Sequence, residues 1–230
     1  MDGNPSVMLV PIADCRSWRF RALNPDRHPL VDAARRLLAG DRSGAEEGLR
    51  AWYAANVVNT AAELFEPTPV APSIADEPAW AIPLPWWGET IEHRRRQAER
   101  NARVEYSLPD LRSEEVSQYW NAAGPVAAEV PAWETERLLR IIESGFQHDQ
   151  EPDLPRVRGL IAPGESVKWE IKSGHHRFAV DAARGLRFRR VVLIEFVRLD
   201  EAATWTGVTS GHFSLEAAQE VLQRVIRGTK

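Results

Sequence analysis

Cysteine is almost absent from this sequence, because Cys15 is the only one among 230 residues. One thiol cannot form a disulfide within the chain, and it cannot supply a thiolate metal cluster. Disulfide-stapled folds and cysteine-rich zinc sites are therefore excluded, and we expect the reducing cytoplasm as the compartment.

Long apolar runs are absent as well. The short run Val7–Ile12 has no basic residue before it, so it does not predict a signal peptide. No stretch approaches the roughly eighteen apolar residues that a membrane helix needs. The net charge of −4 gives no overall attraction to nucleic acid or to an anionic membrane. We expect no membrane partner, and the oligomeric state stays open.

Tryptophan, by contrast, is abundant, with nine in the chain. Trp80, Trp86 and Trp87 lie in the stretch Pro67–Gly88, whose six prolines exclude a long helix. Two interpretations stay open: these rings are buried in a core, or they line a groove for a partner. The Arg94–Arg96 run that follows predicts a solvated helix face.

The hydrophobic spacing predicts a mostly helical first part and an α+β second part. The expected elements are an edge strand Val7–Ile12; helices Leu30–Leu38, Glu46–Val58, a short one capped by Asn59 or Thr60, Glu89–Val104 and Glu134–Gly145; strands Val157–Ile161 and Val167–Ile171; a helix after Gly174; strand Val191–Val197; and helix Leu215–Ile226, capped by Ser214. A loop at Gly124–Pro125 separates the two parts. We expect two domains, a helical region over 1–107 with the Pro/Trp-rich loop and an α+β domain over 108–230.

The segment Val167–Val197 holds the strongest signal for a site. A strand enters the turn Ser173–Gly174, and His175, His176 and Arg177 follow at the start of a helix. A helix start offers free backbone N–H groups and the positive end of the helix dipole, and Arg177 adds a guanidinium. Such a point suits a phosphate or a carboxylate.

Two further features of this segment support an anion site. Ser173 is expected to accept a hydrogen bond from an early helical N–H and to donate its hydroxyl to a ligand oxygen. Between Arg177 and Arg198, six arginines stand against two acids, which gives a local charge of +4. The alternative is an ordinary capped helix with no ligand.

The sequence KSGHHRFAVDAARGLRFRRVVLIEFV resembles the second motif of the ParB/sulfiredoxin-like superfamily. In that superfamily a strand ends in Asp-Gly-x-His-Arg or Gly-Glu-Arg-Arg, and a helix and a further strand follow. Upstream, ETERLLRIIESGFQHDQEPDLPRVRGLI is similar to the superfamily's first helix and strand. The resemblance covers Gly124–Val197 and implies a small mixed sheet with flanking helices.

Members of this superfamily include chromosome-partition CTPases, sulfiredoxin and free-serine kinases, which place nucleotide phosphates at this turn. The resemblance implies that ATP or another nucleotide, with or without Mg²⁺, binds here through Ser173, Gly174, His175, His176 and Arg177. The chain is most similar to the serine kinases at Gly-His-His-Arg, although Ser173 stands where they have Asp. His175 stands where sulfiredoxin has its cysteine, so thiol chemistry is not expected.

The segments WTGVTSGHFSLEAAQEVLQRVI and GPVAAEV, the latter ahead of ETERL, are also similar to ParB-like proteins of bacterial cell-surface polysaccharide loci. The resemblance therefore implies a cytoplasmic nucleotide- or phosphate-binding protein. If it is an enzyme, the expected activity is an ATP-dependent small-molecule phosphotransferase or a nucleotide hydrolase, linked to cell-surface polysaccharide biosynthesis.

Phosphoryl transfer needs a carboxylate that orients or deprotonates a hydroxyl. In the kinases resembled, a glutamate just before the first helix does this; Glu129 matches that position, and Glu134 is a second candidate. His175 is a candidate general base, and His176 and Arg177 are expected to hold the phosphate. Adjacent helical residues point about 100° apart, so a two-histidine metal site is not expected.

Two other functions stay open. Partition-type DNA binding is favoured by the local arginines and opposed by the acidic net charge and the lack of a helix-turn-helix. A non-catalytic scaffold would use the Trp80–Trp87 loop as its partner surface.

Overall fold

The computed structural model describes residues 6–17, 28–120, 126–144 and 154–228. Its elements confirm the α+β class. The strands are β1 (Ser6–Pro11), β2 (Cys15–Arg16), β3 (Arg156–Ile161), β4 (Lys168–Ile171) and β5 (Phe188–Arg198). The helices are α1 (Pro29–Leu38), α2 (Arg42–Ala55), α3 (Ala61–Phe65), α4 (Pro72–Ala75), α5 (Ile91–Glu105), α6 (Val116–Trp120), α7 (Val130–Glu143), α8 (His175–Ala183), α9 (Thr206–Thr209) and α10 (Leu215–Arg227). Gly124, Pro125 and Gly145 lie outside the described residues.

The chain folds into two compact units. The sheet unit comprises Met1–Leu49, Glu134–Leu199 and Leu222–Lys230, and the helical unit comprises Arg50–Trp133 and Asp200–Val221. The predicted domains, 1–107 and 108–230, divide the chain differently, because β1, β2 and α1 belong to the sheet unit. None of the helices in the described ranges is long and apolar enough to cross a bilayer.

The described strands form one mixed sheet in the order β1-β5-β3-β4-β2. The central strand β3 pairs in parallel with β5 and antiparallel with β4. The outer strands are β1, antiparallel to β5, and β2, parallel to β4. The predicted edge strand is confirmed, and its last residue, Pro11, has no N–H to donate, which suits an edge.

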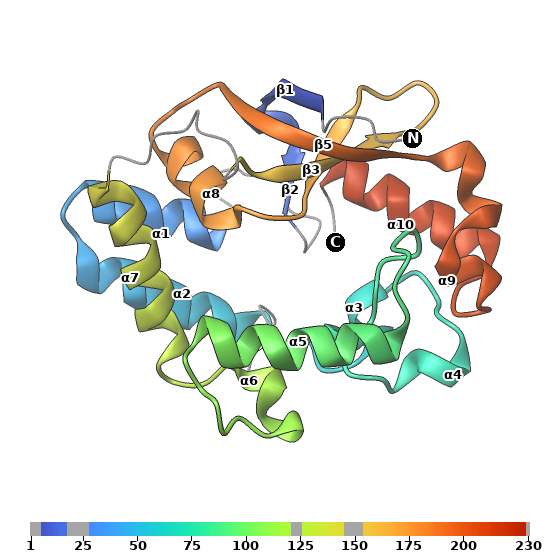
Figure 1. The fold of residues 1–230 in the computed structure, drawn as a ribbon, viewed down its shortest axis with the longest axis horizontal. Coiled ribbons are helices and arrows are strands. Elements are labelled where there is room, and N and C mark those ends of the chain that lie inside the picture. The colour runs from blue at the N-terminus through green and yellow to red at the C-terminus, as the bar shows by residue number, and fades with distance from the viewer. Residues whose placement is uncertain (1–5, 18–27, 121–125, 145–153, 229–230) are drawn as a thin grey trace. The chain divides into compact units, whose positions relative to one another are not determined.

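Glycines end the two helices that pack together in the sheet unit, α1 and α8 (Figure 1). At the end of α8, Gly185 has a φ of 76°. The N–H of Gly185 bonds to Ala182 O and that of Leu186 to Asp181 O, both at 3.0 Å, which is the Schellman pattern. The helix thus ends at a glycine that the sequence places directly after Arg184.

The core of the sheet unit lies between the sheet and these helices. Its fully buried side chains include Val10, Val31, Leu138, Val157, Ile171, Phe178 and Val191. The helix α8 is also joined to the sheet by a buried ion pair between Asp181 and Arg189 of β5. Phe178 and Asp181 thus fix α8, and with it the turn that precedes it, to the sheet.

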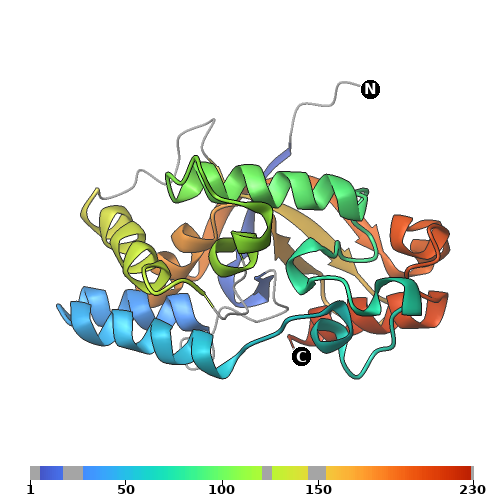
Figure 2. The ribbon, with the colours of Figure 1, turned by 90° about the horizontal axis from the view of Figure 1, so that it is seen from below.

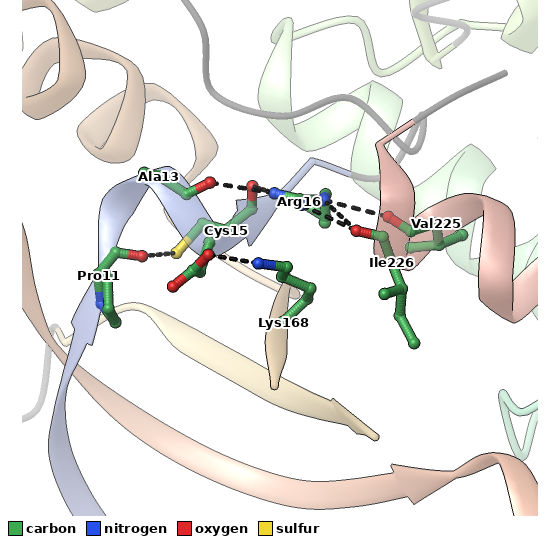
Figure 3. A network of polar contacts seen from close by, with 8 residues as sticks. Pro11, Ala13, Cys15, Arg16, Lys168, Val225 and Ile226 are labelled. Atoms are coloured by element: carbon green, nitrogen blue, oxygen red, sulfur yellow. Dashed lines mark hydrogen bonds and ion pairs between the residues drawn. The ribbon is translucent and has the colours of Figure 1, made fainter. Parts of the chain in front are cut away.

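The short strand β2 is tied to the end of α10 by one buried side chain, Arg16 (Figure 3). Its Nε and Nη2 donate to the carbonyls of Val225 and Ile226, the shortest bond being 2.8 Å, and its Nη1 donates to Ala13 O and Cys15 O. A guanidinium at the negative end of a helix satisfies carbonyls that have no partner within the helix.

The helical unit shows the predicted capping residues. Thr60 Oγ1 accepts from Glu63 N at the start of α3, and Ser214 Oγ accepts from Ala217 N at the start of α10. Helix α5, whose N-cap is Thr90, lies beside α6 (Figure 2). In the same unit, Gly207 N donates to Pro85 O at 2.8 Å, and a Cβ built on Gly207 would lie 2.8 Å from Pro85 Cα. This close approach requires glycine.

Candidate functional site

The turn between β4 and α8 is held to the start of β3. The N–H groups of Lys172 and Ser173 both donate to Arg156 O, at 2.8 and 3.3 Å. In return, Arg156 N donates to Ser173 Oγ at 3.1 Å. Three hydrogen bonds to one residue of the neighbouring strand give the turn a fixed position in the sheet unit.

Gly174 is the N-cap residue of α8, and its φ of 86° lies in the left-handed region that favours glycine. A Cβ built there would lie 3.0 Å from the Pro155 ring and 3.3 Å from Arg177 Nε. The side chain of Arg177 therefore lies over the turn, next to the start of α8.

The predicted capping role of Ser173 is wrong, because the N-cap residue of α8 is a glycine, which has no side chain to act as a cap. Gly174 takes the N-cap position, so Ser173 is one residue too far out, and its oxygen accepts from Arg156 N instead. The N-cap residue of α8 thus brings no side chain to the first-turn N–H groups. The hydroxyl hydrogen of Ser173 can still be donated to a ligand.

His176 contacts a carboxylate from another helix. Its Nε2 makes a short hydrogen bond to Glu134 Oε2 of α7. Only 9% of the Glu134 side chain and 19% of the His176 side chain are exposed, so the pair is largely shielded from water. When Glu134 is ionised it can only accept, and Nε2 is then the donor while Nδ1 is the ring nitrogen without a partner among the described residues.

His175 lies in a different electrostatic environment from its neighbour. Its Nδ1 is closed off from solvent and has no hydrogen-bond partner within the described residues. Burial, followed by the charges of His176, His28 and Lys172, lowers the pKa of His175 to about 3, against a weaker opposing effect of Glu134. His175 is therefore neutral at pH 7, and so low a pKa makes it a weak proton acceptor.

The two predicted carboxylates lie in different places. Glu134 is buried inside α7 and belongs to the sheet unit, against His176 of the predicted turn. Glu129 is exposed and belongs to the helical unit, where its carbonyl accepts from Trp133 N at 3.0 Å. In that unit, burial first and then the charges of Glu129 and Glu115 raise the pKa of Tyr119.

Charged residues on the strands beside the turn were missed by sequence reasoning. Glu170 of β4 is almost fully buried, with Lys172 Nζ at 3.9 Å and Arg158 Nη1 at 3.8 Å, and Arg158 also pairs with Glu195 of β5. These residues face one another because β3 pairs with both neighbours, Arg158 opposite Glu170 and opposite Glu195. Only the strand register could have revealed this cluster.

Part of the predicted local excess of arginine is engaged within the protein. Arg189 pairs with Asp181, and Arg184 donates to Ile142 O at 3.1 Å. The guanidinium of Arg187 lies 5.9 Å from the centre of the Phe188 ring. Of these arginines, Arg177 is the one that lies over the turn.

In the helical unit, the tryptophan loop and the arginine run have structural partners. Trp86 and Trp87 are only 7% and 6% exposed, and Trp86 packs edge-on against Trp205 at 5.4 Å. Arg94 lies over the Trp87 ring at 5.0 Å, and Arg95 pairs with Glu77. The interpretation of Trp86 and Trp87 as buried core residues is confirmed.

Metal binding and family membership add no further constraint. Among the residues that the structure describes, no group of three or more His, Cys, Asp or Glu side chains is arranged to hold a metal ion. Comparison with protein-family models, with curated proteins and with solved structures finds no match.

Proposed function

We propose that this protein binds a phosphate-bearing ligand, a nucleotide or a phosphorylated small molecule, at the turn Ser173–Arg177. The observation that carries the proposal is the start of α8, where the N-cap residue Gly174 brings no capping side chain and Arg177 lies over the turn. Backbone N–H groups, the helix dipole and a guanidinium together favour an anion with several oxygens.

A phosphotransferase activity, the more specific form of this proposal, draws support from the pair Glu134–His176. Phosphoryl transfer to a hydroxyl requires a group that accepts the hydroxyl proton, and catalysis otherwise consists of positioning and charge neutralisation. With Nε2 bonded to Glu134, Nδ1 of His176 is a nitrogen that can accept a proton. The carboxylate would also stabilise the resulting imidazolium.

The proposed fold also rests on this turn and on the elements around it. A ParB/sulfiredoxin-like arrangement is supported by the order of β3, β4, α8 and β5, with the turn at the end of β4. On this proposal the ligand is ATP or another nucleotide, with or without Mg²⁺, and a link to cell-surface polysaccharide biosynthesis remains a prediction from the resemblance.

Calorimetric titration with ATP, CTP and ADP, each with and without Mg²⁺, tests the proposal. We expect one of these nucleotides to bind, and Arg177→Ala to weaken binding about 10-fold to 100-fold, since a charge-assisted hydrogen bond contributes about 1.5–3 kcal/mol. Arg187→Ala is the matched control, because it removes the same charge from an exposed neighbouring position. Its effect should stay below about threefold.

Two results would contradict the proposal or redirect it. No binding by any of the three nucleotides at any Mg²⁺ concentration would remove nucleotide binding. Equal losses of affinity in the two arginine variants would indicate a diffuse electrostatic effect, and duplex DNA should then be tested, since DNA binding weakens steeply with added salt.

A further inference from the structure

The two adjacent histidines of the turn, His175 and His176, differ in their hydrogen-bond partners. Binding of an anion at the proposed site does not by itself require this difference. His176 is bonded to a buried carboxylate, whereas the Nδ1 of His175 is shielded and without a partner in the described residues. Both residues lie in the first turn of α8. The difference therefore lies in which of them can take up a proton.

We propose that His176, positioned by Glu134, is the group that exchanges a proton when the anion binds, and that His175 is not. This inference rests on the proposed phosphate-binding function and adds a proton linkage to it. As the anion arrives, Nδ1 of His176 takes a proton from solvent, keeps it, and donates a hydrogen bond through it to an anion oxygen. When the anion leaves, the same proton returns to solvent.

The surroundings of the two histidines explain the assignment. The charges that act on His175 are those of His176, of Glu134 from α7, of His28 at the N-cap of α1 and of Lys172 at the end of β4. Glu134 is the one acid among them, and its oxygen bonds to His176. An imidazolium at His176 is thus bonded to a carboxylate, whereas for a charged His175 burial and the positive neighbours outweigh the effect of Glu134.

The hydrogen bond at Nε2 also determines which ring nitrogen of His176 is available to solvent and to a ligand. With Nε2–H donated to an ionised Glu134, Nδ1 is the ring nitrogen left for a ligand. The Nδ1 atom has no hydrogen-bond partner within the described part of the chain, and it is not among the buried unsatisfied atoms. It is therefore open to a proton and to a ligand oxygen.

The first experiment measures proton uptake on anion binding. Sulfate is the probe, because it keeps both of its charges between about pH 5 and about pH 8, where histidine titrates. Calorimetry in buffers of different ionisation enthalpy should show uptake that approaches about one proton per sulfate bound at the upper end of this range. Affinity should fall by up to about tenfold per pH unit as the pH rises.

Variants assign the proton to a residue. His176→Gln should abolish the uptake and flatten the pH dependence, and Glu134→Gln, which keeps an acceptor for Nε2–H but removes the charge, should reduce the uptake at neutral pH. His175→Gln should leave the pH dependence in place even if the affinity changes. Glu136→Gln is the matched control on α7, because Glu136 pairs with Arg42 at the surface and should leave both quantities unchanged.

The second experiment needs no ligand, and it keeps the inference testable if His176→Gln does not fold. Nitrogen-15 NMR of the imidazole rings should show His176 with its proton on Nε2 in the neutral form. A proton on Nδ1, or proton uptake that survives in Glu134→Gln at the level of the parent protein, would overturn the inference. Sulfate binding without proton uptake would overturn it while leaving the proposed function intact. No binding of either sulfate or ATP would overturn the proposed function itself.

Discussion

At the scale of single residues, side chains that are adjacent in sequence have different environments in the site. His175 and His176 are adjacent, but burial lowers the pKa of His175 to about 3, whereas His176 has a carboxylate partner. Sequence alone cannot distinguish them, because the difference comes from α7, which is more than one element away along the chain. The proton-transfer role predicted for His175 fits His176 better.

The low pKa of His175 has a consequence for stability. Its unfolded value is about 6.5 and its folded value about 3, so between these values the unfolded chain binds a proton that the folded protein does not. Stability therefore falls as the pH falls through this window. The loss from pH 7.5 to pH 5 should reach up to about 2 kcal/mol, and His175→Gln should remove that part of the pH dependence.

Urea denaturation at both pH values, on the parent protein and the variant, measures this difference. Because each protein is compared with itself at two pH values, any constant cost of the substitution cancels. The same loss of stability in both proteins would show that His175 does not carry the effect.

The two candidate carboxylates, Glu129 and Glu134, show how a small error in a predicted helix boundary changes which residue is assigned to a site. The sequence predicted a helix from Glu134, which put Glu129 in the loop ahead of it, but α7 begins at Val130. Glu134 therefore lies inside the helix, with its side chain fixed in direction by the helical backbone. Glu129 comes directly before α7 and is exposed.

At the scale of elements, the strongly periodic segments were predictable and the shortest strand was not. Helices α1, α8 and α10 have apolar spacing and end signals that are local in the sequence, so their ranges were predicted within one or two residues. Strand β2 has two residues, which is too short for any alternation. Its pairing with β4 depends on tertiary structure alone.

Arg16 makes β2 important despite its length. Replacing Arg16 by Met should cost about 2–4 kcal/mol, because buried carbonyls at the end of α10 would lose their donor. Arg42→Met is the control: Arg42 pairs with Glu136 on the surface, and its loss should cost less than about 1 kcal/mol. Chemical denaturation of both variants measures the two values.

Equal costs for the two substitutions would contradict the structural role of Arg16.

Burial lowers the pKa of Arg16 below its ordinary value, with the charges of Asp14 and Cys15 opposing the shift. Burial also raises the pKa of the Cys15 thiol, so that side chain stays un-ionised beside Arg16.

At the scale of the whole molecule, the class could be predicted but the grouping of segments could not. The order α7, β3, β4, α8, β5, α10 followed from local patterns, whereas the short helix α9 was not predicted. The sheet unit, however, takes β1 and β2 from the start of the chain, and the helical unit takes Asp200–Val221 from near its end. Such groupings depend on contacts between residues far apart in sequence, which leave no periodic signal.

The central claim is that an anion binds at the start of α8, and an NMR titration with ATP tests it most directly. The amide signals of His175, His176 and Arg177 should shift most, and those at the start of α10 should not, because Ser214 already caps that helix. Shifts confined to other residues, or no shifts at saturating ATP, would contradict the account.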